Sequence, residues 1–125
     1  MTASAIVMGV VGIIASFLPQ EILTYAGLPS AGIAPLFIQV LGALYLGFAM
    51  INWMVRAQLI GGIYGRPVAM GNFLHFMVGA LALLKGYFSA PVSGVLLGAT
   101  GIYTIFAISF TIVLFTHPLK RDAAK

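Results

Sequence analysis

The sequence predicts an all-α integral membrane protein, a four-helix bundle of up-down topology that forms a single membrane domain over residues 1–125. Of the 125 residues, 62% are hydrophobic and 6% are charged, whereas soluble domains carry roughly 25% charged residues. The charged residues also divide the chain into four uncharged runs, and each run contains enough apolar sequence to cross a hydrocarbon core of about 30 Å. These runs are 1–20, 22–55, 67–84 and 86–119.

Composition excludes several function classes. The chain has no cysteine, which removes thiol redox catalysis, disulfides and thiolate metal sites. The net charge is +4, but the basic residues lie at the ends of the apolar runs rather than in a solvated patch, so we expect membrane topology and no nucleic-acid partner. We expect no cofactor.

The first helix is expected over about residues 3–18, because Pro19 follows the apolar run. Small residues recur along it at helical spacing, which predicts a face where another helix backbone approaches closely in the bilayer. They include Gly9 and Gly12.

A short interfacial helix is expected at about residues 20–26, between the first two spans. The Pro-Gln-Glu start suits the positive end of a helix dipole, and Gly27 with Pro29 predicts its end. The second span is then expected over about 36–55, with Gly47 on its packing face.

Residues 56–71 contain four glycines and a proline, which predicts a loop at the membrane surface. The third span is expected over about 70–88. The fourth is expected over about 92–116, with residues 117–125 as a basic tail. Its glycines share one stripe, and the first two match the GxxxG pattern of helix packing. These glycines are Gly94, Gly98 and Gly101.

Charge asymmetry predicts the orientation. If the four spans alternate, Lys85 is the one basic residue on its side of the membrane and five basic residues lie on the other. The positive-inside rule therefore puts both termini and the 56–71 loop in the cytoplasm. Glu21 and Lys85 then lie near the same outer boundary, where they pair or where Lys85 snorkels to the interface alone.

The best candidate site is a pocket for an anion or a lipid headgroup at the cytoplasmic end of the second and third spans. Guanidinium groups supply forked donors for phosphate or carboxylate, and amide and imidazole groups can complete the shell. The competing interpretation is that the arginines are topology anchors, the asparagine at the helix start is a cap and the histidine bonds a neighbouring helix. The candidate residues are Asn52, Arg56, Tyr64, Arg66, Asn72 and His75.

No catalytic constellation is expected. His75 and His117 are the two histidines, and Asp122 is the one carboxylate predicted on their side of the membrane, so we propose no metal site. A serine nucleophile would need a base and an orienting acid, and no such set can be assembled.

The segments LGALYLG in the second span and GNFLHFMVGALALLKG in the third, with the layout of four short spans, resemble the DoxX-like group of small bacterial four-helix membrane proteins. The resemblance implies the fold and a bacterial inner membrane. It implies no activity, because redox members among four-helix membrane enzymes depend on cysteines.

Two function hypotheses follow. The first is a non-enzymatic membrane protein that binds lipid, a small amphiphile or a partner subunit, as a homo-oligomer or within a larger membrane complex. The alternative is an oligomeric transporter of a small molecule or an ion. The first is favoured because proton-coupled transport usually uses a membrane-embedded carboxylate, and the spans have none at their centres.

Overall fold

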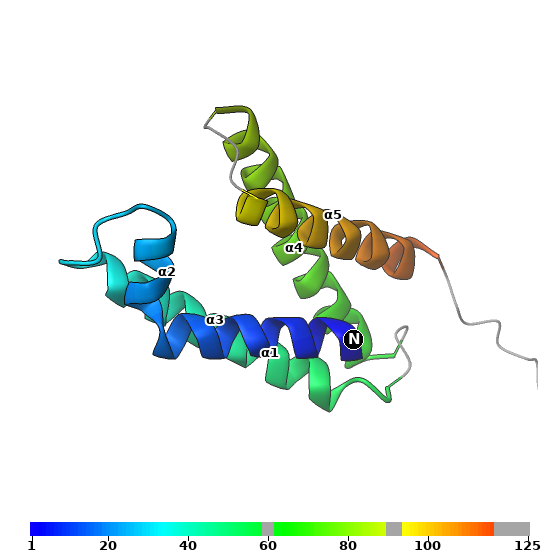
Figure 1. The fold of residues 1–125 in the computed structure, drawn as a ribbon. Helices are drawn as coiled ribbons and strands as arrows, with labels where there is room; N and C mark the ends of the chain where they lie inside the picture. The colour runs from blue at the N-terminus through cyan, green and yellow to red at the C-terminus, as the bar shows by residue number, and fades with distance from the viewer. Residues whose placement is uncertain (59–61, 90–93, 117–125) are drawn as a thin grey trace, which may run out of the picture. The chain divides into compact units, whose positions relative to one another are not determined.

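The computed structural model describes residues 1–58, 62–89 and 94–116. In these ranges the chain is all-α, with five helices and no strand. They belong to two compact units, Met1–Ala57 and Gln58–Lys125, and each unit is described by itself (Figure 1). The basic tail expected at 117–125 lies outside the described residues.

Helix α1 covers Thr2–Phe17 and ends where Pro19 starts the next helix. The Leu18 N–H still bonds the Ile14 carbonyl at 2.8 Å, but the Leu18 backbone has left the helical region, with φ −124° and ψ 45°. Because Pro19 lacks an N–H and has a fixed φ, it suits the first turn of a new helix rather than the continuation of α1. The two helices meet at 94°.

Helix α2 covers Pro19–Tyr25, so the short helix expected at about 20–26 is present. It ends in a Schellman motif: Gly27 N–H bonds the Thr24 carbonyl at 3.0 Å and Leu28 N–H bonds the Leu23 carbonyl at 2.9 Å. Gly27 has φ +70°, a left-handed conformation that glycine adopts without a Cβ penalty. The turn therefore closes the helix and sends the chain back toward α3.

Helix α3 covers Ala34–Met54 and packs along α1 (Figure 1). The contacts pair the start of α1 with the end of α3, so the helices are antiparallel. The backbones approach most closely at Gly12 and Gly42: a Cβ on Gly12 would lie 3.0 Å from the Gly42 carbonyl oxygen, and one on Gly42 would lie 2.9 Å from the Gly12 oxygen. In a bilayer such close approach stabilises helix pairs through dispersion.

Helix α4 covers Gly65–Ser89 and α5 covers Gly94–Phe115. The sequence indicates a start for α4 near residue 70, five residues later than observed. Gly65 and Pro67 are typical of a loop, but Pro67 lies in the first turn of α4, where its missing N–H removes no helical hydrogen bond. Helix α4 therefore begins within the segment that the sequence predicts to be a loop.

The second unit is an antiparallel hairpin of α4 and α5 held by aromatic rings. Phe76 is 1% exposed and stacks on Phe106 and Phe110, with ring centroids 4.7 and 5.8 Å away. One turn before Phe76 on α4, the Phe73 ring meets the ring of Phe115, the last residue of α5, edge to face with centroids 6.1 Å apart. Large rings on both helices therefore bury the shared face of the hairpin.

Three helices, α3, α4 and α5, are long and apolar enough to cross a membrane, and the bent pair α1 and α2 passes the same test when taken together. Their outward faces remain apolar: Met54 on α3 is 71% exposed and Phe88 on α4 is 83% exposed. Such surfaces fit a lipid solvent, since soluble proteins rarely expose large apolar patches.

Candidate functional site

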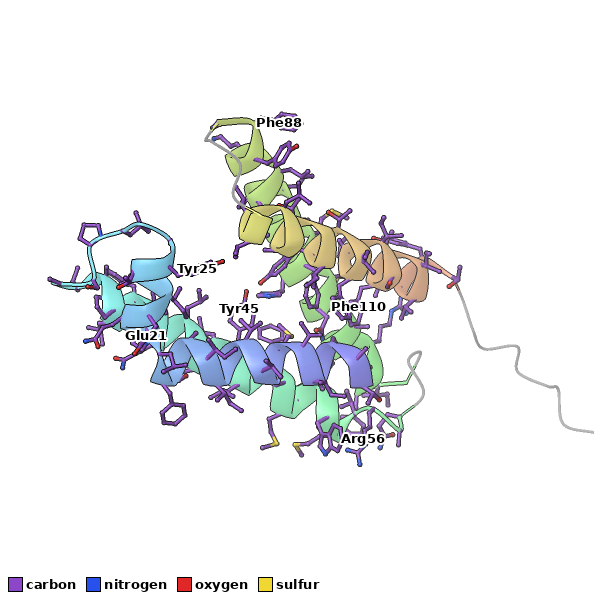
Figure 2. All side chains as sticks on the ribbon, viewed as in Figure 1. Glu21, Tyr25, Tyr45, Arg56, Phe88 and Phe110 are labelled. Atoms are coloured by element: carbon purple, nitrogen blue, oxygen red, sulfur yellow. The ribbon has the colours of Figure 1, made fainter. Side chains whose placement is uncertain are left out.

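Arg56 interacts mainly with its own helix. Its guanidinium lies 3.9 Å from the centroid of the Trp53 ring, and Nη1 donates a hydrogen bond of 2.6 Å to the Trp53 carbonyl. That carbonyl belongs to the last turn of α3, where carbonyls lack intrahelical partners and the helix dipole favours a cation. Arg56, labelled at this end of α3 in Figure 2, therefore caps the helix.

Asn52 lies four residues before Arg56 and is buried, whereas Arg56 is exposed. Asn52 is fully buried, and its Nδ2 donates to the Sδ of Met8 on α1 at 3.6 Å. This amide therefore belongs to the contact between α1 and α3, and Met8, itself fully buried, is its neighbour there. Of these two candidate residues, Asn52 thus lies in the contact between α1 and α3, and Arg56 lies on the surface.

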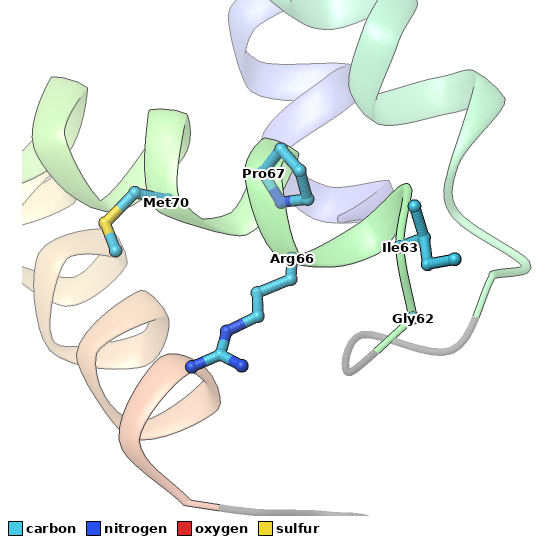
Figure 3. Close-up of a pocket in the computed structure, with 5 residues that line it drawn as sticks. All are labelled: Gly62, Ile63, Arg66, Pro67 and Met70. Atoms are coloured by element: carbon cyan, nitrogen blue, oxygen red, sulfur yellow. The ribbon is translucent and has the colours of Figure 1, made fainter.

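Arg66 lies in the first turn of α4, beside a shallow hollow of about 490 Å³. Figure 3 shows its side chain extended away from the helix, with Ile63 and Met70 on either side. Within the described ranges its guanidinium makes no hydrogen bond and no ion pair. The residues that line the hollow are Gly62, Ile63, Arg66, Pro67 and Met70.

Tyr64 and Asn72 do not join this hollow. Tyr64 precedes α4 in a turn and is 74% exposed. Asn72 is fully buried inside α4, where its Nδ2 donates to the Val68 carbonyl at 2.8 Å. Because α4 begins at Gly65, Asn72 is an interior residue of the helix and not a cap at its start.

His75 lies deeper than the sequence suggests. It is the eleventh residue of α4 and is half-buried, and its Nε2 is 3.3 Å from the hydroxyl of Tyr103 on α5. The Tyr103 ring fits against Gly79, since a Cβ there would lie 2.6 Å from its Cδ1. Sequence reasoning missed Tyr103 as a partner, although both residues lie at the midpoints of their uncharged runs.

Glu21 and Lys85 belong to different units. Glu21 is exposed on α2, where it lines a hollow of about 360 Å³ with Gln20, Thr24 and Tyr25. Lys85 is exposed near the end of α4. The expected pairing of Glu21 with Lys85 stays a prediction.

The glycines divide into packed and open positions. Gly12 lies against α3 as described, and a Cβ on Gly9 would make an ordinary 3.7 Å contact with Ala49. The sequence analysis does not identify Gly42, on the facing helix, as a packing residue. The pattern that indicates it is the pair of small residues Gly42 and Ala49, which are two helical turns apart on α3. A Cβ would meet no described atom within 4 Å at Gly47, Gly94, Gly98 or Gly101.

The described part of the chain holds no group of three His, Asp or Glu side chains able to bind a metal ion. The titratable residues of the second unit are instead dispersed, with Arg66 and Lys85 toward the two ends of α4 and His75 between them. The chemistry available is therefore hydrogen bonding and charge recognition by single side chains.

The chain matches no protein-family model, no curated protein and no solved structure. The resemblance to the DoxX-like group stays a prediction.

Proposed function

We propose that this protein is a non-enzymatic integral membrane protein that binds an anionic amphiphile, with the Arg66 hollow as its headgroup site. The observation that carries the proposal is the combination of one exposed arginine with apolar neighbours in a hollow of about 490 Å³. A guanidinium offers forked N–H donors that match phosphate or carboxylate oxygens.

The lining favours an amphiphile over a free ion. Ile63 is 87% exposed and Met70 is 43% exposed, so both offer apolar surface to the glycerol and first acyl carbons of a lipid. Gly62 has no side chain to restrict the approach. One cation beside this apolar surface complements a ligand with one negative charge and a hydrocarbon body.

Arg56 is not part of this site in our proposal. Its guanidinium already bonds the Trp53 carbonyl and covers the Trp53 ring. The two arginines therefore form a matched pair in which one caps a helix and the other binds ligand.

In the proposed arrangement four spans cross the bilayer up and down, with α2 at the interface and the loop before α4 in the cytoplasm of a bacterial cell. The positive-inside rule supports this orientation, because five of the six basic residues then lie on the cytoplasmic side. The Arg66 hollow would face the inner leaflet, where anionic headgroups attract basic residues.

The test compares Arg66→Gln with Arg56→Gln after purification in a mild detergent. Mass spectrometry then measures the phosphatidylglycerol that each protein retains. We expect Arg66→Gln to lose most of this lipid and Arg56→Gln to keep it, with both variants monodisperse by size exclusion. Equal retention in Arg66→Gln and the parent would reject the hollow as the site.

A further inference from the structure

A hydrogen-bonded pair of titratable side chains lies at the centre of the α4–α5 hairpin. His75 is nine residues from Arg66 and ten from Lys85, which at 1.5 Å per residue puts it about 14 Å along the helix from each charged residue. Tyr103 is the tenth of the 22 residues of α5. The pair therefore occupies the depth at which polar groups cost most in a bilayer and are by default functional candidates.

The geometry of the pair supports proton exchange. The His75 Nε2 and the Tyr103 hydroxyl oxygen are 3.3 Å apart. A neutral imidazole carries its proton on one nitrogen, so Nε2 either accepts from the phenol or donates to it. When Nε2 donates, the phenol hydrogen is directed elsewhere. A change of tautomer thus reverses the direction of this hydrogen bond.

The surroundings hold Tyr103 in place. Its ring lies against the backbone at Gly79, as described above, and meets the Phe76 ring at 5.3 Å between centroids. The His75 and Tyr103 rings are 5.6 Å apart. Among the described residues of α4 and α5, Tyr103 is the titratable group that contacts His75, whereas Arg66, Lys85 and Tyr87 lie toward the ends of α4.

We propose that His75 and Tyr103 form a proton-transfer site in the membrane core and that the protein conducts protons. The imidazole, which carries its proton on Nε2, accepts a second proton at Nδ1 from a hydronium ion on one side, and that ion leaves as water. The Nε2 proton then passes to the Tyr103 oxygen as the phenol releases its own proton to a water molecule on the other side, which becomes hydronium, so one positive charge enters and one leaves. A change of the His75 tautomer and rotation of the phenol O–H restore the starting state. This function is independent of lipid binding at Arg66.

A structural hydrogen bond and a proton-transfer site make different demands on residue 75. Glutamine at position 75 puts an amide nitrogen near the position of Nε2, so it can still donate to the Tyr103 oxygen, but it does not titrate. His75→Gln therefore preserves the structural hydrogen bond and removes the proton-transfer group. Tyr103→Phe is the complementary change, because it keeps the ring against Gly79 and removes only the hydroxyl.

The test is proton uptake into liposomes that contain the purified protein and an internal pH-sensitive dye, driven by a potassium diffusion potential with valinomycin. We expect the proton flux of the parent to exceed that of empty liposomes, and we expect His75→Gln and Tyr103→Phe each to lower this excess flux at least about tenfold. Tyr87→Phe, near the end of α4, should leave the flux unchanged. Flux in His75→Gln equal to the parent, or a parent equal to empty liposomes, would overturn the proposal. Size exclusion and circular dichroism verify folding, and Tyr103→Phe decides the matter if His75→Gln misfolds.

Discussion

Gly42 lies so close to Ser16 that a methyl group on Gly42 would come within 2.7 Å of the Ser16 backbone nitrogen. The neighbour is backbone, so it cannot rotate away as a flexible side chain can. On the other side of the same crossing, a Cβ on Gly12 would lie 2.9 Å from the Leu46 backbone nitrogen. The close approach of α1 and α3 therefore requires glycine on both helices.

Replacing Gly42 with alanine is expected to lower the free energy of unfolding by about 1–3 kcal/mol, the usual cost of overpacking a close contact. The control is Gly47→Ala on the same helix, where a Cβ meets no described atom within 4 Å and better helix propensity favours the variant. Thermal unfolding in detergent, followed by circular dichroism, measures both. Equal midpoints for the two variants would contradict the crossing.

Gly79→Ala is expected to destabilise the α4–α5 hairpin, because the Tyr103 ring occupies the space that the new Cβ needs. Combining Gly79→Ala with Tyr103→Ala should cost less than the sum of the single changes, since the ring that clashes is then absent. A coupling of about 0.5–3 kcal/mol is typical of residues in contact. Gly86→Ala on the same helix is the control, because its position is open, and strict additivity would exclude the contact.

Trp53 is the one tryptophan of the chain, so its fluorescence reports on Arg56 directly. Arg56→Ala should raise the quenching of Trp53 by acrylamide, because the guanidinium no longer covers the ring, and should cost about 0.5–1 kcal/mol of stability. Arg66→Ala is the control and should leave quenching unchanged. Equal quenching in the parent and Arg56→Ala would mean that the cation does not cover the ring.

The helices were largely predictable because apolar runs and prolines define them. The expected short helix at 20–26 appears as Pro19–Tyr25 and the expected helix at 36–55 appears as Ala34–Met54. The start of α4 was placed too late, because the glycines of residues 61–65 and Pro67 resemble a loop whether or not a helix begins among them. Propensity alone does not show that Pro67 lies in a first turn.

The candidate site was predictable as a set of residue types but not as an arrangement. Sequence does not show where a guanidinium points, so Arg56 and Arg66 looked equivalent although one caps α3 and the other lines a hollow. The contact of His75 with Tyr103 depends on the register of α4 against α5, which the aromatic packing of Phe76 determines. The lipid and proton proposals each depend on one of these arrangements.

The bend at Leu18 makes α1 a short rod. Its 16 residues extend about 24 Å at 1.5 Å per residue, less than the roughly 30 Å thickness of a typical hydrocarbon core. In the proposed arrangement, in which α1 crosses the bilayer without α2, the bilayer around α1 thins locally, at an elastic cost that falls as the acyl chains of the surrounding lipids become shorter. Under that proposal, hydrophobic mismatch at this one helix favours membranes of short-chain lipids and draws such lipids to α1.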